Sequence, residues 1–150
     1  GSGVLPDGTD TSSIQSPVIN YAYERVRPIL DRMKKTGEPD KYHGFRLRYA
    51  NPFNGGWSLP TMGAHLSLLP ANFKSETYRS TDGTIFVCLE GKGTTKIGNV
   101  TVEWGPRDVF VAPTWAPYSH VVQGESVMFS ISDRPAQEAL GIWREERKPG

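Results

Sequence analysis

The chain has 150 residues, of which 37% are hydrophobic and 11% aromatic, and this composition suits one globular domain with a substantial core. The net charge is +1, with both signs scattered along the chain, so the sequence indicates neither a nucleic-acid-binding surface nor a membrane-binding one. Sixteen glycines and twelve prolines are many for a helical bundle and favour a turn-rich β protein.

The single cysteine, Cys88, lies in an apolar run at 85–89. One cysteine excludes a disulfide framework. We expect a buried thiol in a strand, which fits a cytoplasmic location. No apolar stretch approaches the roughly 20 residues that cross a bilayer, and no signal peptide is visible. Gly1 to Gly3 look like the remnant of an expression tag, and the missing initiator methionine fits a piece of a longer protein.

The N-terminal part is predicted to contain one helix. Residues 1–15 are expected to be the tag remnant and a flexible polar arm, and residues 16–43 a helical connection. Ser16 and Pro17 suit a helix start, and Gly37 should follow its end. Pro28 is expected to kink or split the helix. An apolar face at helical spacing predicts packing against the barrel or a neighbouring domain: Ile19, Tyr23, Val26, Leu30 and Met33.

Residues 44–134 are predicted to form a β-barrel. The first strand alternates Phe45, Leu47 and Tyr49 with Arg46 and Arg48, as a half-buried strand does. About nine short strands with turn signals between them indicate a sandwich or jelly-roll barrel. Their expected ranges are 45–49, 64–69, 73–78, 84–89, 94–97, 100–104, 109–112, 118–122 and 127–131. Residues 135–150 are predicted to hold a short helix at 136–143 and a charged, solvated tail.

Several segments between Gly44 and Arg147 together carry a resemblance to a known family. They are GFRLRYANPFNGG, SLPTMGAHLSLLPANF, YRSTDGTIFVCLEGKG, WGPRDVFVAPTW and SDRPAQEALGIWREER, in that order. The pattern resembles the cupin superfamily, and more narrowly the C-terminal cupin half of gentisate 1,2-dioxygenase and its relatives acting on salicylate and hydroxynaphthoate. The resemblance implies an all-β fold, the cupin double-stranded β-helix (jelly-roll) barrel, with an N-terminal helix and a short C-terminal helix.

Enzymes of this family cleave the ring of gentisate with O₂ at an Fe(II) site. A cupin holds its metal with two histidines one residue apart on one strand, a carboxylate shortly after, and a third histidine on a later strand. Residues i and i+2 of a strand share a face, and such a facial ligand set leaves positions open for O₂ and substrate.

In this chain the family's four ligand positions carry other residues. The two histidine positions of the first motif (72–91) fall on Tyr78 and Ser80, the carboxylate position falls on Thr84, and the histidine position of the second motif falls on Tyr118. We therefore interpret this barrel as free of metal and of catalytic residues, with the four positions lining its interior. The resemblance implies that Fe(II) belongs to the catalytic, N-terminal cupin of a parent enzyme, which would be the partner of this domain in a homo-oligomer.

The three histidines leave alternatives open. We expect His43 to be a surface or capping residue in a turn. A residual metal site built from His65, His120 and Tyr78 is conceivable, but a hydrogen-bonded core histidine is the simpler interpretation. Tyr78, Tyr118, Trp115 and Phe86 could line a pocket for a flat aromatic acid.

Three functions therefore compete. The first is a structural, oligomerising domain of a ring-cleaving dioxygenase. The second is a stand-alone small cupin that binds an aromatic acid without chemistry, and the third is a metal-dependent cupin enzyme with non-standard ligands.

Overall fold

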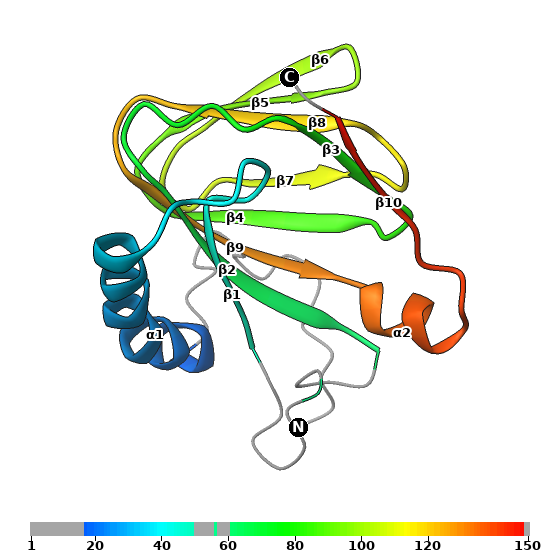
Figure 1. Cartoon of the computed structure of the whole chain (residues 1–150), viewed down its shortest axis with the longest axis horizontal. Coiled ribbons are helices and arrows are strands. Elements are labelled where there is room, and N and C mark those ends of the chain that lie inside the picture. Colours follow the sequence, from blue (N-terminus) through cyan, green and yellow to red (C-terminus); the bar gives the residue numbers. More distant parts are fainter. Residues whose placement is uncertain (1–16, 50–55, 57–60, 149–150) are drawn as a thin grey trace, which may run out of the picture.

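Two antiparallel sheets of five strands face each other (Figure 1). The structure is a computed structural model that describes residues 17–49, 56 and 61–148. One sheet has the strand order β1-β2-β9-β4-β7 and the other the order β10-β3-β8-β5-β6. This arrangement is the all-β cupin jelly roll that the sequence predicts.

The elements have the following bounds. The first sheet contains β1 (Phe45–Arg48), β2 (Gly63–Leu69), β9 (Ser126–Ser132), β4 (Thr84–Glu90) and β7 (Val109–Ala112). The second contains β10 (Glu145–Lys148), β3 (Thr77–Ser80), β8 (Tyr118–Val122), β5 (Gly93–Ile97) and β6 (Val100–Trp104). Helix α1 (Pro17–Thr36) precedes the barrel and helix α2 (Arg134–Ala139) follows β9. Neither helix is long and apolar enough to cross a membrane, as far as the described residues go.

Most predicted strands are confirmed. β6, β7 and β8 have the predicted bounds, and β1, β2, β4, β5 and β9 differ by one residue at one or both ends. The third strand is displaced, because it was predicted at 73–78 and β3 begins at Thr77. Lys74 forms only an isolated bridge to Val121, while the backbone N–H of Glu76 donates to the Lys41 carbonyl at 2.8 Å. Residues 73–76 therefore bond in part to β8 and in part to the segment before β1, and they do not form a continuous strand with either.

The end of the chain differs more from the prediction. Helix α2 ends at Ala139, not at Trp143, and Gly141 follows with a positive φ of 73°. The charged tail is mostly exposed, as predicted, but it also forms a strand that was not predicted, β10, which pairs with β3 so that Glu146 lies opposite Arg79. These two side chains form an ion pair of 3.0 Å. A strand of charged residues lacks the apolar alternation by which strands are found in a sequence.

Two apolar clusters lie on the two faces of the first sheet. The inner cluster fills the space between the sheets and includes the buried thiol of Cys88, as expected. Burial, more than the nearby Asp108 carboxylate, raises the pKa of Cys88 to about 11. The outer cluster lies beneath α1 and contains Leu30 and Phe45, which are 0% and 5% exposed. Tyr23, Val26 and Met33 also pack there, which confirms the predicted apolar face; the side chain of Ile19 lies outside the described residues. The helix is not split at Pro28.

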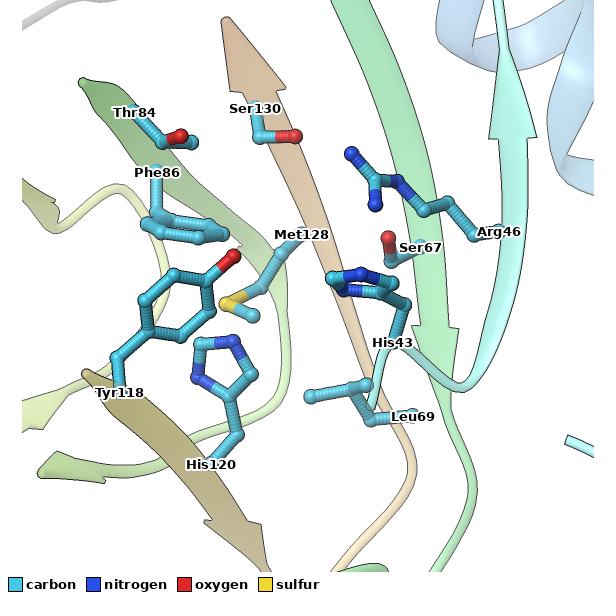
Figure 2. A pocket seen from close by; sticks show the side chains of 10 residues that line it. All are labelled: His43, Arg46, Ser67, Leu69, Thr84, Phe86, Tyr118, His120, Met128 and Ser130. Atoms are coloured by element: carbon cyan, nitrogen blue, oxygen red, sulfur yellow. The ribbon is translucent and has the colours of Figure 1, made fainter. Parts of the chain in front are cut away.

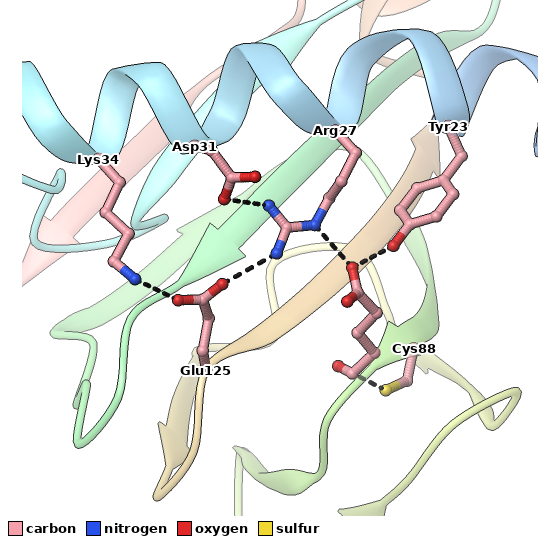
Figure 3. A network of polar contacts seen from close by, with 7 residues as sticks. Tyr23, Arg27, Asp31, Lys34, Cys88 and Glu125 are labelled. Atoms are coloured by element: carbon pink, nitrogen blue, oxygen red, sulfur yellow. Dashed lines mark hydrogen bonds and ion pairs between the residues drawn. The ribbon is translucent and has the colours of Figure 1, made fainter.

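An ionic network also ties α1 to the barrel (Figure 3). The Arg27 guanidinium donates to Asp31 at 2.6 Å, to Glu90 at 2.7 Å and to Glu125 at 2.9 Å. Tyr23 donates to the same Glu90 carboxylate, and Lys34 to Glu125. The buried apolar face of α1 and this ionic network therefore fix the helix on the outer surface of the sheet.

Candidate functional site

The interior of the barrel contains the positions where the cupin pattern would place a metal. Tyr78 on β3 and Tyr118 on β8 are paired residues, only 3% and 5% exposed. The Tyr78 hydroxyl donates to Glu145 Oε2 at 2.8 Å. Burial, followed by this hydrogen bond, raises the pKa of Tyr78, and burial raises that of Tyr118. Both phenols are therefore neutral at ordinary pH.

Ser80 and Thr84 complete this set. Ser80 ends β3 and Thr84 begins β4, and they are 4% and 7% exposed. Tyr78 and Ser80 share the inner face because they are two residues apart on one strand. All four side chains that the sequence assigns to the degenerate ligand positions are thus buried.

His120 is held by a buried relay of hydrogen bonds. Trp104 Nε1 donates to Thr95 Oγ1 at 2.8 Å, and Thr95 Oγ1 lies 2.7 Å from His120 Nδ1. The Thr95 oxygen accepts from the indole and forms a second hydrogen bond with His120 Nδ1, whose direction depends on the tautomer of the imidazole. Burial, and then the charge of Arg46, lowers the pKa of His120 to about 3. His120 is therefore the hydrogen-bonded core histidine of the simpler interpretation, with the Phe86 ring at a centroid distance of 5.2 Å.

His65 is held in a similar way on the opposite sheet. Arg46 on β1 donates from its terminal nitrogen to His65 Nδ1 at 3.0 Å. A guanidinium can only donate, so His65 carries its hydrogen on Nε2. Burial, and then the charge of Arg46, lowers the pKa of His65 to about 2. His65 lines an outer cleft whereas His120 lines the interior pocket, so the fold places the two histidines in different cavities.

Two residues lie elsewhere than predicted. Trp115 does not line the interior pocket with Tyr118 and Phe86; it is 36% exposed on the β7–β8 turn, with the Arg79 guanidinium 4.3 Å above its ring. His43, expected on the surface, lies edge-on to Tyr78 with the ring centroids 4.5 Å apart. The adjacent Gly44 has φ +71°, and a Cβ there would lie 2.5 Å from the Leu68 carbonyl oxygen. The tight approach of this glycine to β2 carries His43 inward.

Arg46 is the functional candidate that the sequence did not single out. Its alternation with Phe45 and Leu47 is that of a half-buried strand, in which the polar residues usually face solvent. However, Phe45 pairs with Leu68 on the face covered by α1, so Arg46, opposite Ser67, is on the inner face. The amphipathic helix upstream was the available signal, because it requires an apolar outer face on the strands that it covers.

Two neighbouring spaces are lined by Arg46. The interior pocket (Figure 2) has an accessible volume of only about 10 Å³, which is room for one water molecule. An aromatic ring does not fit there. The second space is an open cleft of about 420 Å³ beside β1. Arg46 and His43 line both spaces.

The donor set in the barrel does not fit Fe(II). Two neutral phenols and two aliphatic hydroxyls are poor ligands for ferrous iron. Nδ1 of each buried histidine is already engaged in a hydrogen bond, with Arg46 at His65 and with Thr95 at His120. Across the described residues, no three His, Cys, Asp or Glu side chains come together as a metal site. No chemical step through a metal is therefore derived for this barrel.

Known proteins resemble this chain over most of its length. No protein-family model matches the chain. Gentisate 1,2-dioxygenase 1 of Aquipseudomonas alcaligenes is 44% identical over 147 residues, which cover 98% of this chain and 42% of that protein. The 5-aminosalicylate 1,2-dioxygenase of a Comamonas species is 34% identical over 132 residues, covering 87% and 35%. A solved structure of a salicylate 1,2-dioxygenase variant from Pseudoaminobacter salicylatoxidans superposes with a TM-score of 0.75 at 25% identity, covering 99% of this chain and 44% of that one.

The two facing antiparallel sheets and the superposition on a salicylate 1,2-dioxygenase define a cupin. More narrowly, the chain is a cupin domain of the gentisate 1,2-dioxygenase family. It spans less than half of the length of the relatives that it matches.

Proposed function

We propose that this chain is the C-terminal, metal-free cupin domain of a gentisate 1,2-dioxygenase-type enzyme, and that its role there is structural. One observation carries the proposal: a barrel that aligns over 98% of its length with 42% of a gentisate 1,2-dioxygenase holds Tyr78, Ser80, Thr84 and Tyr118 at its ligand positions. Fe(II) and ring cleavage then belong to the other cupin half, and a cytoplasmic location follows from that assignment.

An uncovered apolar strip supports a structural role. Ile85 on β4 lies opposite Val111 on β7, on the outer face of the first sheet. Ile85, Val109 and Val111 are 42%, 46% and 52% exposed. β-Branched residues on an outer sheet face at an edge strand are typical of a surface that another domain or subunit covers. The occupant that we propose is the remaining half of the parent protein, in the same or another subunit.

Metal content and oxygen uptake test the assignment. The chain is incubated anaerobically with Fe(II), freed of excess metal, analysed for iron, and then assayed for O₂ uptake with gentisate. We expect far less than one iron per chain and no uptake above the protein-free rate. One tightly bound iron per chain with gentisate turnover would overturn the proposal in favour of a metal-dependent enzyme with unusual ligands.

The structural role has its own test in the full-length parent protein. Val111→Asp should weaken assembly, measured by light scattering after size exclusion, because it places a charge in the proposed contact. Val100→Asp is the matched control, since Val100 is 61% exposed on β6, away from the strip. Equal assembly of the two variants would argue against the strip as the contact.

A further inference from the structure

Arg46 brings a permanent positive charge to the inner face of the first sheet. Its guanidinium points toward the interior of the barrel (Figure 2) and donates to His65 Nδ1 at 3.0 Å. Burial, and then the arginine charge, lowers the pKa of His65 to about 2. The same two effects lower the pKa values of His43 and His120, so all three histidines of the chain are neutral at ordinary pH. A partly buried cation with only a neutral partner is costly unless an opposite charge lies beside it.

The carboxylates closest to the interior are engaged by other groups. Burial lowers the pKa of Arg46 and the charge of Asp82 opposes this shift, but Asp82 accepts from Trp143 Nε1 at 2.8 Å. Glu145 accepts from the Tyr78 hydroxyl at 2.8 Å. Among the described residues, no carboxylate lines the interior pocket or forms an ion pair with Arg46. The arginine charge therefore lacks a counter-charge in the part of the barrel that it faces.

Two serine hydroxyls lie beside this guanidinium. Arg46 on β1 is opposite Ser67 on β2, and Ser130 on β9 is opposite His65, two residues from Ser67 on the same face. Figure 2 shows the oxygens of Ser67 and Ser130 directed toward the guanidinium. Neither hydroxyl is hydrogen bonded to another of the described residues, although buried hydroxyls normally have partners. Donors from three adjacent strands can therefore converge on one acceptor.

The interior pocket limits what this acceptor can be. Its volume of about 10 Å³ is room for one water-sized species, so an anion of several atoms does not fit. Leu69, Phe86 and Met128 supply its apolar part, and apolar surroundings strengthen the attraction between opposite charges. A water molecule would satisfy the two serine hydroxyls but leave the arginine charge unbalanced, whereas a monatomic anion does both.

We propose that Arg46, Ser67 and Ser130 form a binding site for a single halide ion, chloride under ordinary conditions. The ion accepts hydrogen bonds from the guanidinium and from the two hydroxyls, and it balances the arginine charge inside the barrel. Because its ligands come from β1, β2 and β9, the ion binds the folded chain and stabilises it. The site does not depend on the assignment to a ring-cleaving enzyme.

The dependence of stability on chloride tests the proposal on the unaltered chain. Sodium chloride replaces sodium gluconate at constant ionic strength, so that screening stays the same and only the smaller anion fits the pocket. An ion that binds only the folded chain lowers the unfolding equilibrium constant by the factor 1 + [Cl⁻]/Kd. Urea denaturation should follow this factor, which is about ten-fold at ten times the Kd, and bromide should replace chloride. Equal stability in chloride and gluconate would overturn the proposal, and this result needs no variant.

Bromide locates the ion directly, because it scatters anomalously whereas water does not. A crystal of the chain grown in sodium bromide should show an anomalous peak between the Arg46 guanidinium and the Ser130 hydroxyl. Bromide on the outer surface only, with none beside Arg46, would show adventitious ions and contradict the site.

Matched variants separate the site from a general effect of charge. Arg46→Met should abolish the chloride dependence, and Arg46→Lys should keep a weaker one, since it retains the charge but loses the fork of donors. Ser130→Ala should raise the Kd for chloride at least roughly ten-fold, because it removes a hydrogen bond to a charged group.

Two controls remove the same groups elsewhere. Arg32→Gln lies on the exposed side of α1, and Ser119→Ala lies on the opposite face of β8 from Tyr118. Both should keep the chloride dependence of the unaltered chain. Each variant is first compared by circular dichroism. If Arg46→Met does not fold, Ser130→Ala against Ser119→Ala still decides, and an equal Kd for chloride in these two variants would contradict the assignment.

Discussion

Tyr78 and Tyr118 face each other across β3 and β8, with their rings edge to face and the centroids 5.6 Å apart. They occupy positions where the cupin pattern has histidine ligands, and they fill the space with ring carbon. A barrel built this way obtains stability from aromatic packing at the point where a catalytic relative would need an open coordination site.

The two phenols predict different responses to loss of their hydroxyls. Tyr78→Phe removes the 2.8 Å hydrogen bond to Glu145 and should lower the free energy of unfolding by about 1 kcal/mol. Tyr118→Phe should change it by less than about 0.5 kcal/mol, because the Tyr118 hydroxyl has no partner among the described residues. Urea denaturation measures both. Equal losses would mean that the Tyr118 hydroxyl is bonded in solution.

The hydrogen bonds that join Trp104, Thr95 and His120 predict that replacing the Thr95 hydroxyl by a methyl group strongly lowers the free energy of unfolding. Thr95 is 0% exposed, and Thr95→Val leaves both the indole N–H and His120 Nδ1 without partners, at a cost of about 2–4 kcal/mol. Thr94→Val, on the opposite face of β5, is the control and should cost less than about 0.5 kcal/mol. Chemical denaturation compares the two variants. Equal costs of Thr95→Val and Thr94→Val would contradict the relay.

The ionic network between α1 and the barrel predicts that the free energy of unfolding depends on pH. The hydrogen bond from Lys34 lowers the pKa of Glu125 below its ordinary value of 4.5. Burial opposes this shift, and the hydrogen bond from Arg27 adds to it. The folded chain therefore favours the ionised carboxylate, and this contribution is complete above pH 4.5 and is lost as the pH falls through the lower folded value.

Glu125→Gln should accordingly cost about 1 kcal/mol at pH 7 and almost nothing near pH 3. Thermal unfolding across this range measures the difference. Glu103→Gln, an exposed residue of β6 without an ion pair in the described part of the chain, should show little difference at either pH. A cost of Glu125→Gln that persists in acid would point to packing instead of charge.

Two glycines with positive φ predict unequal costs of a methyl group. Gly91 has φ +82°, and a Cβ would lie 2.3 Å from Ser126 Oγ and 2.7 Å from the Glu125 carbonyl oxygen. Gly98 has φ +57° with nothing within 4 Å of the added atom. Gly98→Ala should lower the free energy of unfolding by about 1 kcal/mol, because alanine is strained at positive φ. Gly91→Ala should lower it by at least about 2 kcal/mol, because the neighbouring backbone must also move. Urea midpoints give the comparison, and equal costs would mean that the β4–β5 turn relaxes freely.

Much of the architecture follows from local sequence. The run 84–90 is mostly apolar or β-branched and lies between Gly83 and Gly91, so the position of this strand could be predicted to within a residue. The apolar face of α1 and its start at Pro17 follow from spacing and capping in the same way. Aligning the sequence with the cupin motif also predicts that its four ligand positions carry Tyr78, Ser80, Thr84 and Tyr118 in place of histidine and carboxylate.

Long-range packing decided the rest. Glu145 to Lys148 have no strand signal of their own and become β10 only because β3 offers an unpaired edge. His43 enters the core because Gly44 lies tightly against Leu68. The alternation in β1 showed that Arg46 and Phe45 face opposite ways, but not which face is inside. A period of two distinguishes the two faces of a strand without naming the buried one, and here both faces are covered, one by α1 and the other by the second sheet. The sequence alone therefore determined the cupin fold, whereas only the tertiary structure placed the side chain of Arg46 on the inner face of β1.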